Sequence, residues 1–466
     1  MIVSCIKHGA PKEQTYFIAD TSNGLAAQDV RGDLPLDVGD FVERIASGGL
    51  AVVQEGSGNE DLRRIAANAS ASFIRKEAYR TGNAEIDKIT SKMKGRLDMI
   101  AALIMRKMML SAPIIVRFHN DADGSGGAYA LYLSVRDFAS AHSLRTNFVW
   151  QMQRSVSYTE QDAENDILIT NNYECVEKPL LVIIDFGTNQ ESNPGIEKVG
   201  DRFDIAWLDH HPVVPEFGGA ALPNYVNTWQ FGGDSNYTAG LLTSVMCKSF
   251  SSVDTSEMEG ASLIGDYSDY ATEKGAEMSA LLDFITSDLQ AIYGPGKMNV
   301  TPQEIDAIMT NKERSRELLE YANMRMEEAL DNGLKSIRKY SLRNANLAVL
   351  DFEDIRSEDS KYPLPGRYAS KLLDRLDEKG MSRTVLVVSV GSYLLMRIDK
   401  ELCADFDLTR AMDEMKSRYP DEIAGGGGHR CAGSIKLKFK ELSRQMTASL
   451  VGIIRAEIGY DETTKN

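Results

Sequence analysis

Residues 203–212 read Phe-Asp-Ile-Ala-Trp-Leu-Asp-His-His-Pro, and the other informative motifs of the chain can be arranged around this stretch. Its apolar centre, residues 205–208, predicts a buried strand of a parallel sheet. Asp209, His210 and His211 follow at the end of that strand, and a carboxylate beside two imidazoles is typical of a metal site. Because the chain has only 6 histidines, an adjacent pair after an aspartate favours a metal centre over a purely structural pair.

A second predicted strand, residues 113–118, runs into His119-Asn-Asp-Ala-Asp-Gly and then into a helix expected over residues 128–138. Strand, turn and helix in this order form the α/β unit whose strand ends build ligand crevices. The carboxylates of Asp121 and Asp123 repel each other at this spacing unless a cation or a proton lies between them. The competing interpretation is a polar turn in which Asp123 caps the helix.

A third predicted strand, residues 180–184, ends at Asp185, which we expect at the same edge of the sheet. Alone, Asp185 is a helix cap, but beside the other motifs it is a candidate bridging ligand of two metal ions. A later helix around Ala261 carries two more carboxylates, Asp266 and Asp269, for which a solvated helix face is the competing interpretation.

The amino-terminal residues 1–80 predict a small, strand-rich unit. Strands are expected at residues 16–19, 41–45 and 50–53, with turn residues between them. A small barrel of the oligonucleotide-binding type and an inert cap both fit this pattern. From residue 84 to residue 110 the apolar spacing becomes helical and leads into the first motif.

Residues 273–340 are rich in charge and predict a helical bridge between domains. Thr301 and Glu304 form a capping box around Pro302, which opens one long helix expected to continue through Met324. This stretch carries no pattern that points to chemistry.

A smaller α/β domain is expected from there to the end of the chain. The predicted strands are residues 346–352, 384–390, 393–398 and 434–440, and the predicted helices are residues 367–378 and 408–418. The expected organisation is therefore a β-rich unit at 1–80, a catalytic domain at 84–272, the bridge at 273–340 and a substrate-binding domain at 341–466.

Four consecutive glycines precede His429 and Arg430 in this last domain. Such a run can be a flexible linker. Because it lies next to two side-chain donors and a well-patterned strand, a cradle of backbone amides for phosphate is the better interpretation.

Composition limits the class of protein. The 466 residues suffice for two or three domains, and no apolar run reaches the length of a membrane span, so a cytoplasmic location is expected. The 5 cysteines lack metal-site spacing and predict neither a disulfide framework nor a zinc site, which leaves them as core fillers. A net charge of −16 argues against a surface coated with phosphate-binding lysines and leaves room for a local basic groove.

The motifs resemble, in order, those of the DHH phosphoesterases with a DHHA1 domain, over about residues 111 to 460. In size, in the form of the first motif and in the extra amino-terminal region, the chain is most similar to archaeal RecJ-like single-strand exonucleases. Some of these associate with the GINS replication complex. The resemblance implies an α/β chain in which a parallel-sheet DHH domain is joined by the helical bridge to a smaller α/β DHHA1 domain.

The resemblance also implies two manganese ions, with magnesium as a substitute, in a cleft between the domains. Asp121 and Asp185 would hold one ion, and Asp123, Asp185, His210 and Asp269 would hold the other. Asp185 would then bridge the pair.

Three further residues take catalytic roles by the same resemblance. His211 would face the scissile phosphate, and Asp209 would orient the imidazoles. His119 departs from the longer spacing of the family's pyrophosphatase branch, so it is either a direct ligand or a neighbour of one.

The substrate's terminal phosphate would bind to the second domain. The residues implied are Gly426, Gly427, Gly428, His429, Arg430 and Arg397. Binding of the terminal phosphate would select the end of a strand and favour exonucleolytic cleavage.

The expected activity is manganese-dependent release of nucleoside monophosphates from single-stranded DNA or RNA, by attack of a hydroxide held between two metal ions. One alternative is a hydrolase of very short oligoribonucleotides or cyclic dinucleotides. Another is a scaffold of a replication complex whose nuclease activity is incidental.

Overall fold

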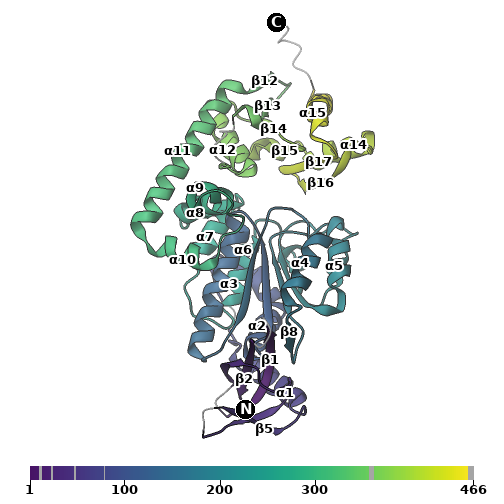
Figure 1. The fold of residues 1–466 in the computed structure, drawn as a ribbon. Coiled ribbons are helices and arrows are strands. Elements are labelled where there is room, and N and C mark those ends of the chain that lie inside the picture. The colour runs from purple at the N-terminus through teal and green to yellow at the C-terminus, as the bar shows by residue number, and fades with distance from the viewer. Residues whose placement is uncertain (10–12, 23–24, 47–48, 78, 356–360, 460–466) are drawn as a thin grey trace. The chain divides into compact units, whose positions relative to one another are not determined.

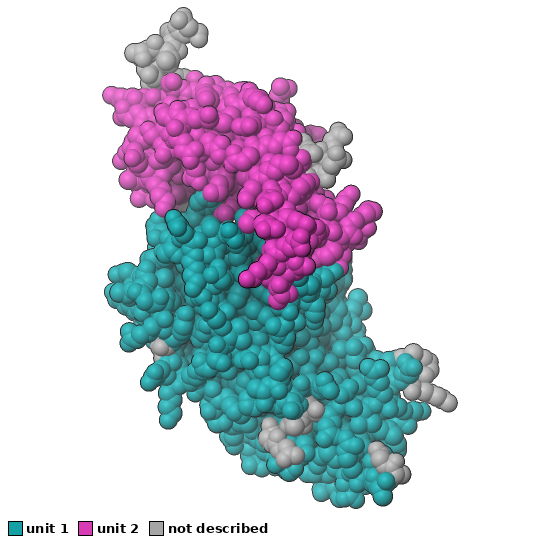
Figure 2. Space-filling model, turned by 90° about the vertical axis from the view of Figure 1, so that its left-hand side faces the viewer, with its two compact units in different colours: residues 1–282, 299–307 teal, residues 283–298, 308–466 magenta. Residues whose placement is uncertain are grey.

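The computed structural model describes residues 1–9, 13–22, 25–46, 49–77, 79–355 and 361–459. The chain divides into two compact units, residues 1–282 with 299–307 and residues 283–298 with 308–466 (Figure 2). The predicted α/β class is confirmed, because both units combine helices with sheets. The domain boundaries predicted from the sequence stay predictions.

The amino-terminal residues form an antiparallel sheet in the order β3-β2-β1-β4-β5. Its strands are β1 (Ile2–His8), β2 (Gln14–Asp20), β3 (Ala26–Gly32), β4 (Phe41–Arg44) and β5 (Leu50–Gln54). In the part of the chain that the structure describes, this order does not close into a barrel. The three predicted strands are present, whereas β1 and β3 were missed. Consecutive residues of β1 are buried, so its sequence does not alternate.

A short strand from the next region, β8 (Tyr173–Cys175), pairs with β1 and joins the amino-terminal sheet to the rest of its unit. This pairing sets Cys5 opposite Cys175, and the two form a disulfide. Cys403 and Cys431 form another. The interpretation of the cysteines as unpaired core fillers is therefore wrong for these four. Strand pairing brings Cys5 to Cys175, and packing of α13 (Lys400–Cys403) brings Cys403 to Cys431.

The parallel sheet has the order β11-β10-β9-β6-β7. Its strands are β6 (Pro113–His119), β7 (Asn147–Gln153), β9 (Leu180–Ile184), β10 (Asp204–Asp209) and β11 (Tyr225–Asn227). Helices cover both faces, with α3 (Ala122–Ala141) and α6 (Ala239–Cys247) on one side and α4 (Glu160–Thr170) and α5 (Asn193–Val199) on the other (Figure 1). This double cover explains why the central strands are continuous apolar runs.

The helices of the chain, in order, have the following bounds: α1 (Asn59–Phe73), α2 (Ala84–Met109), α3 (Ala122–Ala141), α4 (Glu160–Thr170), α5 (Asn193–Val199), α6 (Ala239–Cys247), α7 (Ser256–Gly265), α8 (Ala276–Ser287), α9 (Leu289–Tyr293), α10 (Pro302–Thr310), α11 (Lys312–Ser336), α12 (Pro365–Glu378), α13 (Lys400–Cys403), α14 (Leu408–Arg418) and α15 (Ser443–Ile458). None of those described is long and apolar enough to cross a membrane. The single long helix predicted after Thr301 is two helices, because Asn311 caps a new one with its side chain.

The register of the parallel sheet brings three strand ends together. Phe118, Ile184 and Leu208 pair in one row across β6, β9 and β10. The polar residue that follows each of them therefore lies at the same carboxyl edge. The strand order reverses between β6 and β9, and such switch points are where open α/β sheets bind ligands.

The second unit contains a mixed sheet in the order β12-β13-β14-β15-β17-β16, in which only β13 and β14 are parallel. The strands are β12 (Arg338–Ser341), β13 (Asn346–Asp351), β14 (Thr384–Val390), β15 (Tyr393–Ile398), β16 (Ile423–His429) and β17 (Ala432–Leu437). Every strand predicted for this region is present within a few residues of its expected bounds.

A buried cationic network fastens α4 to β6. The Arg117 guanidinium, only 4% exposed, donates to both carboxylate oxygens of Asp166 at 2.7 and 2.8 Å. It also contacts Asp162 at 3.2 Å, and the Tyr158 hydroxyl donates to Asp166 at 2.9 Å. Each buried charge thus has a hydrogen-bonding partner, which is the condition for tolerating it.

We expect Arg117→Met to destabilise the fold by about 3–5 kcal/mol, because it leaves the buried Asp166 without its cation. The double variant Arg117→Met/Asp166→Leu should recover most of this loss, since it removes both charges. Denaturant unfolding of the three proteins measures the difference. Equal stability of Arg117→Met and the wild type would contradict the assigned network.

Candidate metal centre

One group of side chains forms around His210, directly after β10. The Nε2 atom of His210 lies 3.5 Å from Asp123 Oδ2, 3.3 Å from Asp185 Oδ1 and 2.9 Å from Asp266 Oδ2. One ligand atom from each of the four residues lies within 4.8 Å of the others. Three carboxylates and one imidazole therefore converge on a space that suits a divalent cation.

The orientation of His210 leaves one ring nitrogen for this cation. Its Nδ1 lies 2.8 Å from the Ser235 carbonyl oxygen, so Nδ1 carries the proton and donates to that carbonyl. Neither His210 Nε2 nor Asp185 Oδ1 makes a hydrogen bond within the described residues, although both atoms are buried. Buried polar atoms without partners are costly, and a cation between these two would satisfy both.

A second group forms on the other side of Asp185. His119 Nδ1 lies 2.6 Å from Asp121 Oδ2 and 3.8 Å from Asp185 Oδ2, and the three residues form a possible ligand set of their own. Asp185 therefore belongs to both groups, with one oxygen toward each. The residues fit a pair of neighbouring cations that share this carboxylate.

The third possible ligand set joins Asp209 and His211 to Asp185 and His210. The Asp209 carboxylate is fully buried and lies 2.7 Å from His211 Nδ1, and it also accepts hydrogen bonds from the backbone N–H groups of His210 and His211. The Thr188 hydroxyl donates to its other oxygen at 2.5 Å. The His211 side chain is 53% exposed and is the reachable imidazole of the pair.

The local backbone conformation positions the side chains of Asp185 and Asp123. Asp185 has a φ of 67°, the left-handed region that aspartate tolerates better than most residues, so the chain turns sharply after β9. Asp123 accepts hydrogen bonds from the N–H groups of Ala239 and Gly240, at 2.9 and 2.6 Å, where the positive end of α6 favours a carboxylate. A Cβ on Gly240 would lie 2.8 Å from Asp123 Oδ1, so only glycine permits this approach.

The first turn of α3 also differs from the expectation. Asp121, rather than Asp123, is the cap of this helix and accepts a hydrogen bond from the Gly124 N–H at 3.0 Å. The helix starts at Ala122 instead of residue 128, because the Asp121 side chain caps it there. The glycines that follow pack closely against neighbouring segments. Both aspartates are thereby fixed at the sheet edge.

The structure groups Asp266 with His210, whereas the sequence suggested Asp269, whose role as a ligand stays a prediction. Asp266, the residue that ends α7, lies at His210, whereas Asp269 is exposed and its N–H donates to Asn236 Oδ1 at 2.8 Å. Between them Tyr267 adopts a φ of 55°, in the left-handed region. Spacing in the sequence could not choose between two carboxylates three residues apart. Thr188 was also missed, and no sequence pattern marked it.

The protonation of the cluster reflects its crowding. Burial, followed by the Asp266 carboxylate, raises the pKa of Asp123 to about 6. Burial and the charges of Asp123 and Asp121 raise the pKa of Asp185 well above its usual value. Burial lowers the pKa of His119, but the Asp121 carboxylate outweighs it and raises that pKa to about 9. Burial also lowers the pKa of His210, but the Asp185 and Asp266 carboxylates outweigh it and raise that pKa well above its ordinary value.

The expected glycine cradle in the second unit is a β-strand. Residues 425–428 pair with β17 as part of β16. Gly426 has a φ of 142°, and a Cβ there would lie 2.5 Å from the Ser434 carbonyl oxygen, so the close pairing requires glycine. The alternating sequence of β17 supplies the partner that turns this run into a strand.

The other substrate-binding candidates lie near this hairpin. Arg397 on β15 pairs with Ala432 on β17, which pairs with His429 on β16, so the three share one row. Arg397 Nε donates to Ser370 Oγ at 3.1 Å, and Arg430 is exposed and donates to the Ala404 carbonyl at 2.6 Å. The side chain of His429 lies outside the described part of the structure.

Comparison with known proteins identifies the fold. No family model matches the chain. The uncharacterized protein MJ1198 of Methanocaldococcus jannaschii is 22% identical over 399 residues, which are 75% of this chain and 52% of that protein, so the chain spans about half of this relative.

Two solved structures resemble the chain more closely in shape than in sequence. The DHH domain of PF0399, a member of a family of ribosomal proteins, has a TM-score of 0.69 and 20% identity, covering 85% of this chain and 96% of its own. RecJ of Thermus thermophilus in complex with Mn²⁺ has a TM-score of 0.51 and 11% identity, covering 80% and 60%. The chain has the DHH phosphoesterase fold. Within this fold, the described cluster of histidines and aspartates could hold metal ions.

We expect Asp266→Asn to lower the affinity for Mn²⁺ by at least about a hundredfold, because it removes a charged ligand of the His210 group. Asp269→Asn, three residues away, is the matched control and should change the affinity by no more than about twofold. Calorimetric titration of both variants with Mn²⁺ measures this. A larger loss in the control would restore Asp269 as the ligand.

Without a cation, stability should fall as the pH rises from about 5 to about 8. Asp123 and Asp185 have raised pKa values, so their stabilisation is complete below about pH 4 and is lost as the pH passes the folded-state values, about 6 for Asp123. The raised pKa of His119 gives the same sign, with stabilisation lost toward about pH 9. Thermal melts in EDTA should show this slope, and Asp185→Asn should flatten it. A stability that increases across this range would contradict the assignment.

Proposed function

We propose that this chain is a manganese-dependent phosphodiesterase, and specifically an exonuclease that releases nucleoside monophosphates from single-stranded DNA or RNA. The observation that supports it best is the sharing of Asp185 between two ligand groups, His119 with Asp121 and Asp123 with His210. A carboxylate shared in this way would hold two metal ions next to each other, as two-metal phosphoryl chemistry requires.

The donor set favours manganese, with magnesium as a substitute. His119, Asp121 and Asp185 would hold one ion, and Asp123, Asp185, His210 and Asp266 would hold the other. Mixed imidazole and carboxylate ligands suit manganese better than magnesium, which prefers oxygen ligands alone. When bound, two such ions activate a water molecule and neutralise charge on the phosphoryl oxygens.

His211 and Asp209 handle the proton of the leaving group in this proposal. Asp209 accepts from His211 Nδ1 and so fixes the ring and its tautomer, while Thr188 holds the opposite oxygen of Asp209. The exposed His211 imidazole can then donate a proton through Nε2 to the oxygen that leaves phosphorus. This division keeps His210 as a ligand and His211 as the acid.

The second unit contributes phosphate binding in this proposal. Arg397 and Arg430 supply cationic donors, and the exposed edge of residues 426–428 supplies backbone amides near His429. A row of this kind binds the phosphate of a terminal nucleotide, which favours cleavage from a chain end. Association with the GINS complex and a cytoplasmic location stay predictions.

Digestion of end-labelled single-stranded DNA and RNA in Mn²⁺ tests the function. We expect monophosphates to be released one at a time from one end of the strand. His211→Ala should lower kcat by about a hundredfold or more while Mn²⁺ binding stays unchanged, because the residue moves a proton and holds no metal in this assignment.

The alternatives give distinct results in the same experiment. Internal fragments without monophosphates would rule out an exonuclease. Hydrolysis confined to dinucleotides or cyclic dinucleotides would favour the short-substrate enzyme. Complete inactivity of a wild-type protein that binds Mn²⁺ would favour the scaffold.

A further inference from the structure

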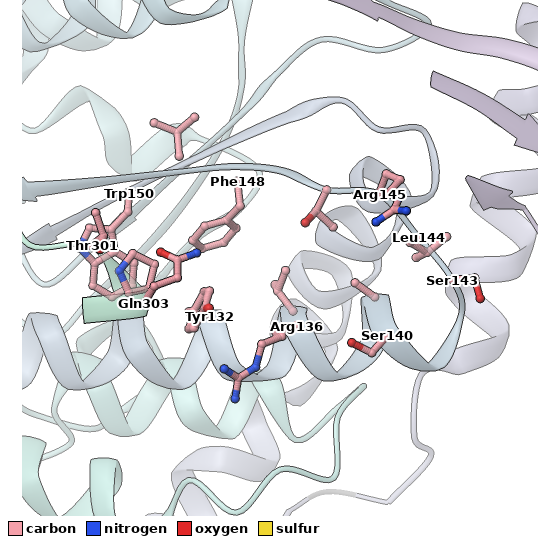
Figure 3. A pocket seen from close by; sticks show the side chains of 15 residues that line it. Tyr132, Arg136, Ser140, Ser143, Leu144, Arg145, Phe148, Trp150, Thr301 and Gln303 are labelled. Atoms are coloured by element: carbon pink, nitrogen blue, oxygen red, sulfur yellow. The ribbon is translucent and has the colours of Figure 1, made fainter. Parts of the chain in front are cut away.

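A hollow of about 790 Å³ lies on the first unit, between α3 and β7 (Figure 3). Tyr132 and Arg136 on α3 form one wall, and Phe148 on β7 forms the other, with Gln303 near one end. Its volume is within the range of ligand sites. None of the residues in the metal groups lines it, so the hollow is a separate feature.

The hollow runs along an open strand edge. β7 ends the order of the parallel sheet, and in the described residues it pairs only with β6. The Trp150 carbonyl accepts a hydrogen bond from Asn299 Nδ2 at 3.1 Å, so this carbonyl points away from β6. Because backbone groups alternate along a strand, those of Phe148 also point outward. A strand edge with such groups is a template for another strand.

The side chains beside this edge form an aromatic surface with an unused donor. Phe148 and Trp150 are two residues apart and therefore project from the same face, with ring centroids 6.1 and 6.5 Å from that of Tyr132. Trp150 is only 6% exposed, and its Nε1–H has no hydrogen-bond partner within the described residues. A buried donor without an acceptor is costly, and a ligand with a carbonyl group would satisfy it.

Two arginines lie at the sides of the hollow. Arg136 contacts Asp306 at 2.7 Å, and Arg145 contacts Asp29 at 3.2 Å. Both arginine side chains are about half exposed or more, at 49% and 64%. Exposed ion pairs contribute little to stability, so carboxylates of a ligand can compete for these guanidinium groups.

We propose that the hollow binds an extended, acidic segment of a partner protein, which adds to β7 as a further strand. The outward N–H groups of Phe148 and Trp150 and the Phe148 carbonyl supply the pairing groups, and the Trp150 carbonyl joins them if the peptide displaces Asn299. The aromatic side chains take alternate apolar residues, and the arginines take acidic ones. Single-stranded nucleic acid would stack on the rings, but its sugar–phosphate backbone lacks the alternating N–H and C=O groups that pair along a strand edge. The peptide is therefore the better match.

Selection from a random dodecapeptide library against the full-length protein tests the proposal. We expect enriched peptides that alternate apolar and acidic residues and that slow hydrogen exchange at the amides of Phe148 and Trp150. Arg136→Glu should weaken the synthesised peptide at least about tenfold. Arg64→Glu, which breaks a similarly exposed pair with Asp61 on α1, is the matched control and should have little effect.

Chemical changes in the peptide keep the test independent of protein folding. The N–H groups of an extended peptide point alternately to its two edges, so two peptides are made, each methylated at the nitrogens of one edge. The peptide that is methylated on the edge facing β7 should lose binding, because it lacks the donors of the added strand. Unchanged affinity after methylation of either edge would overturn strand addition, as would failure to enrich any peptide. Displacement of the peptide by a single-stranded oligonucleotide, with the same amides protected, would assign the hollow to nucleic acid instead. Each result is independent of Mn²⁺-dependent hydrolysis.

Discussion

Repulsion among buried carboxylates is the constraint on which the candidate metal centre depends. Asp121, Asp123 and Asp185 lie at one sheet edge, close enough that Asp123 and Asp185 both resist ionisation. The fold opposes this repulsion with His119 and His210 and with the amino-terminal end of α6. The carboxylate repulsion that these groups do not offset favours the binding of cations.

This arrangement lowers local stability in favour of function. Asp185 adopts a backbone conformation that few residues tolerate, and a buried oxygen of its carboxylate lacks a hydrogen bond in the described structure. The apolar strands on either side and the satisfied network of Arg117 and Asp166 hold the edge in place. The open edge of β7 is unsatisfied in a different way, since its backbone groups lack a neighbouring strand rather than a charge. The carboxylate cluster favours a cation, and the β7 edge favours the peptide that we propose.

The sequence by itself determined the strands and the residues at their ends. Apolar runs before His119, Asp185 and Asp209 predicted buried parallel strands, because only strands covered on both faces are continuously apolar. Their carboxyl ends must meet at one edge, so the convergence of these residues followed without coordinates. Most strands of the second unit could be predicted in the same way, from local patterns that require no knowledge of their partners.

The tertiary structure decided what depends on contacts between distant segments. The choice of Asp266 over Asp269 depends on where α7 ends relative to His210, and the role of Thr188 depends on the register of β9 against β10. The pairing of Cys5 with Cys175 and the strand formed by the glycine run likewise required partners far away in the chain. Sequence periodicity reports whether a residue is buried, but only the packed chain fixes which buried residue lies beside it.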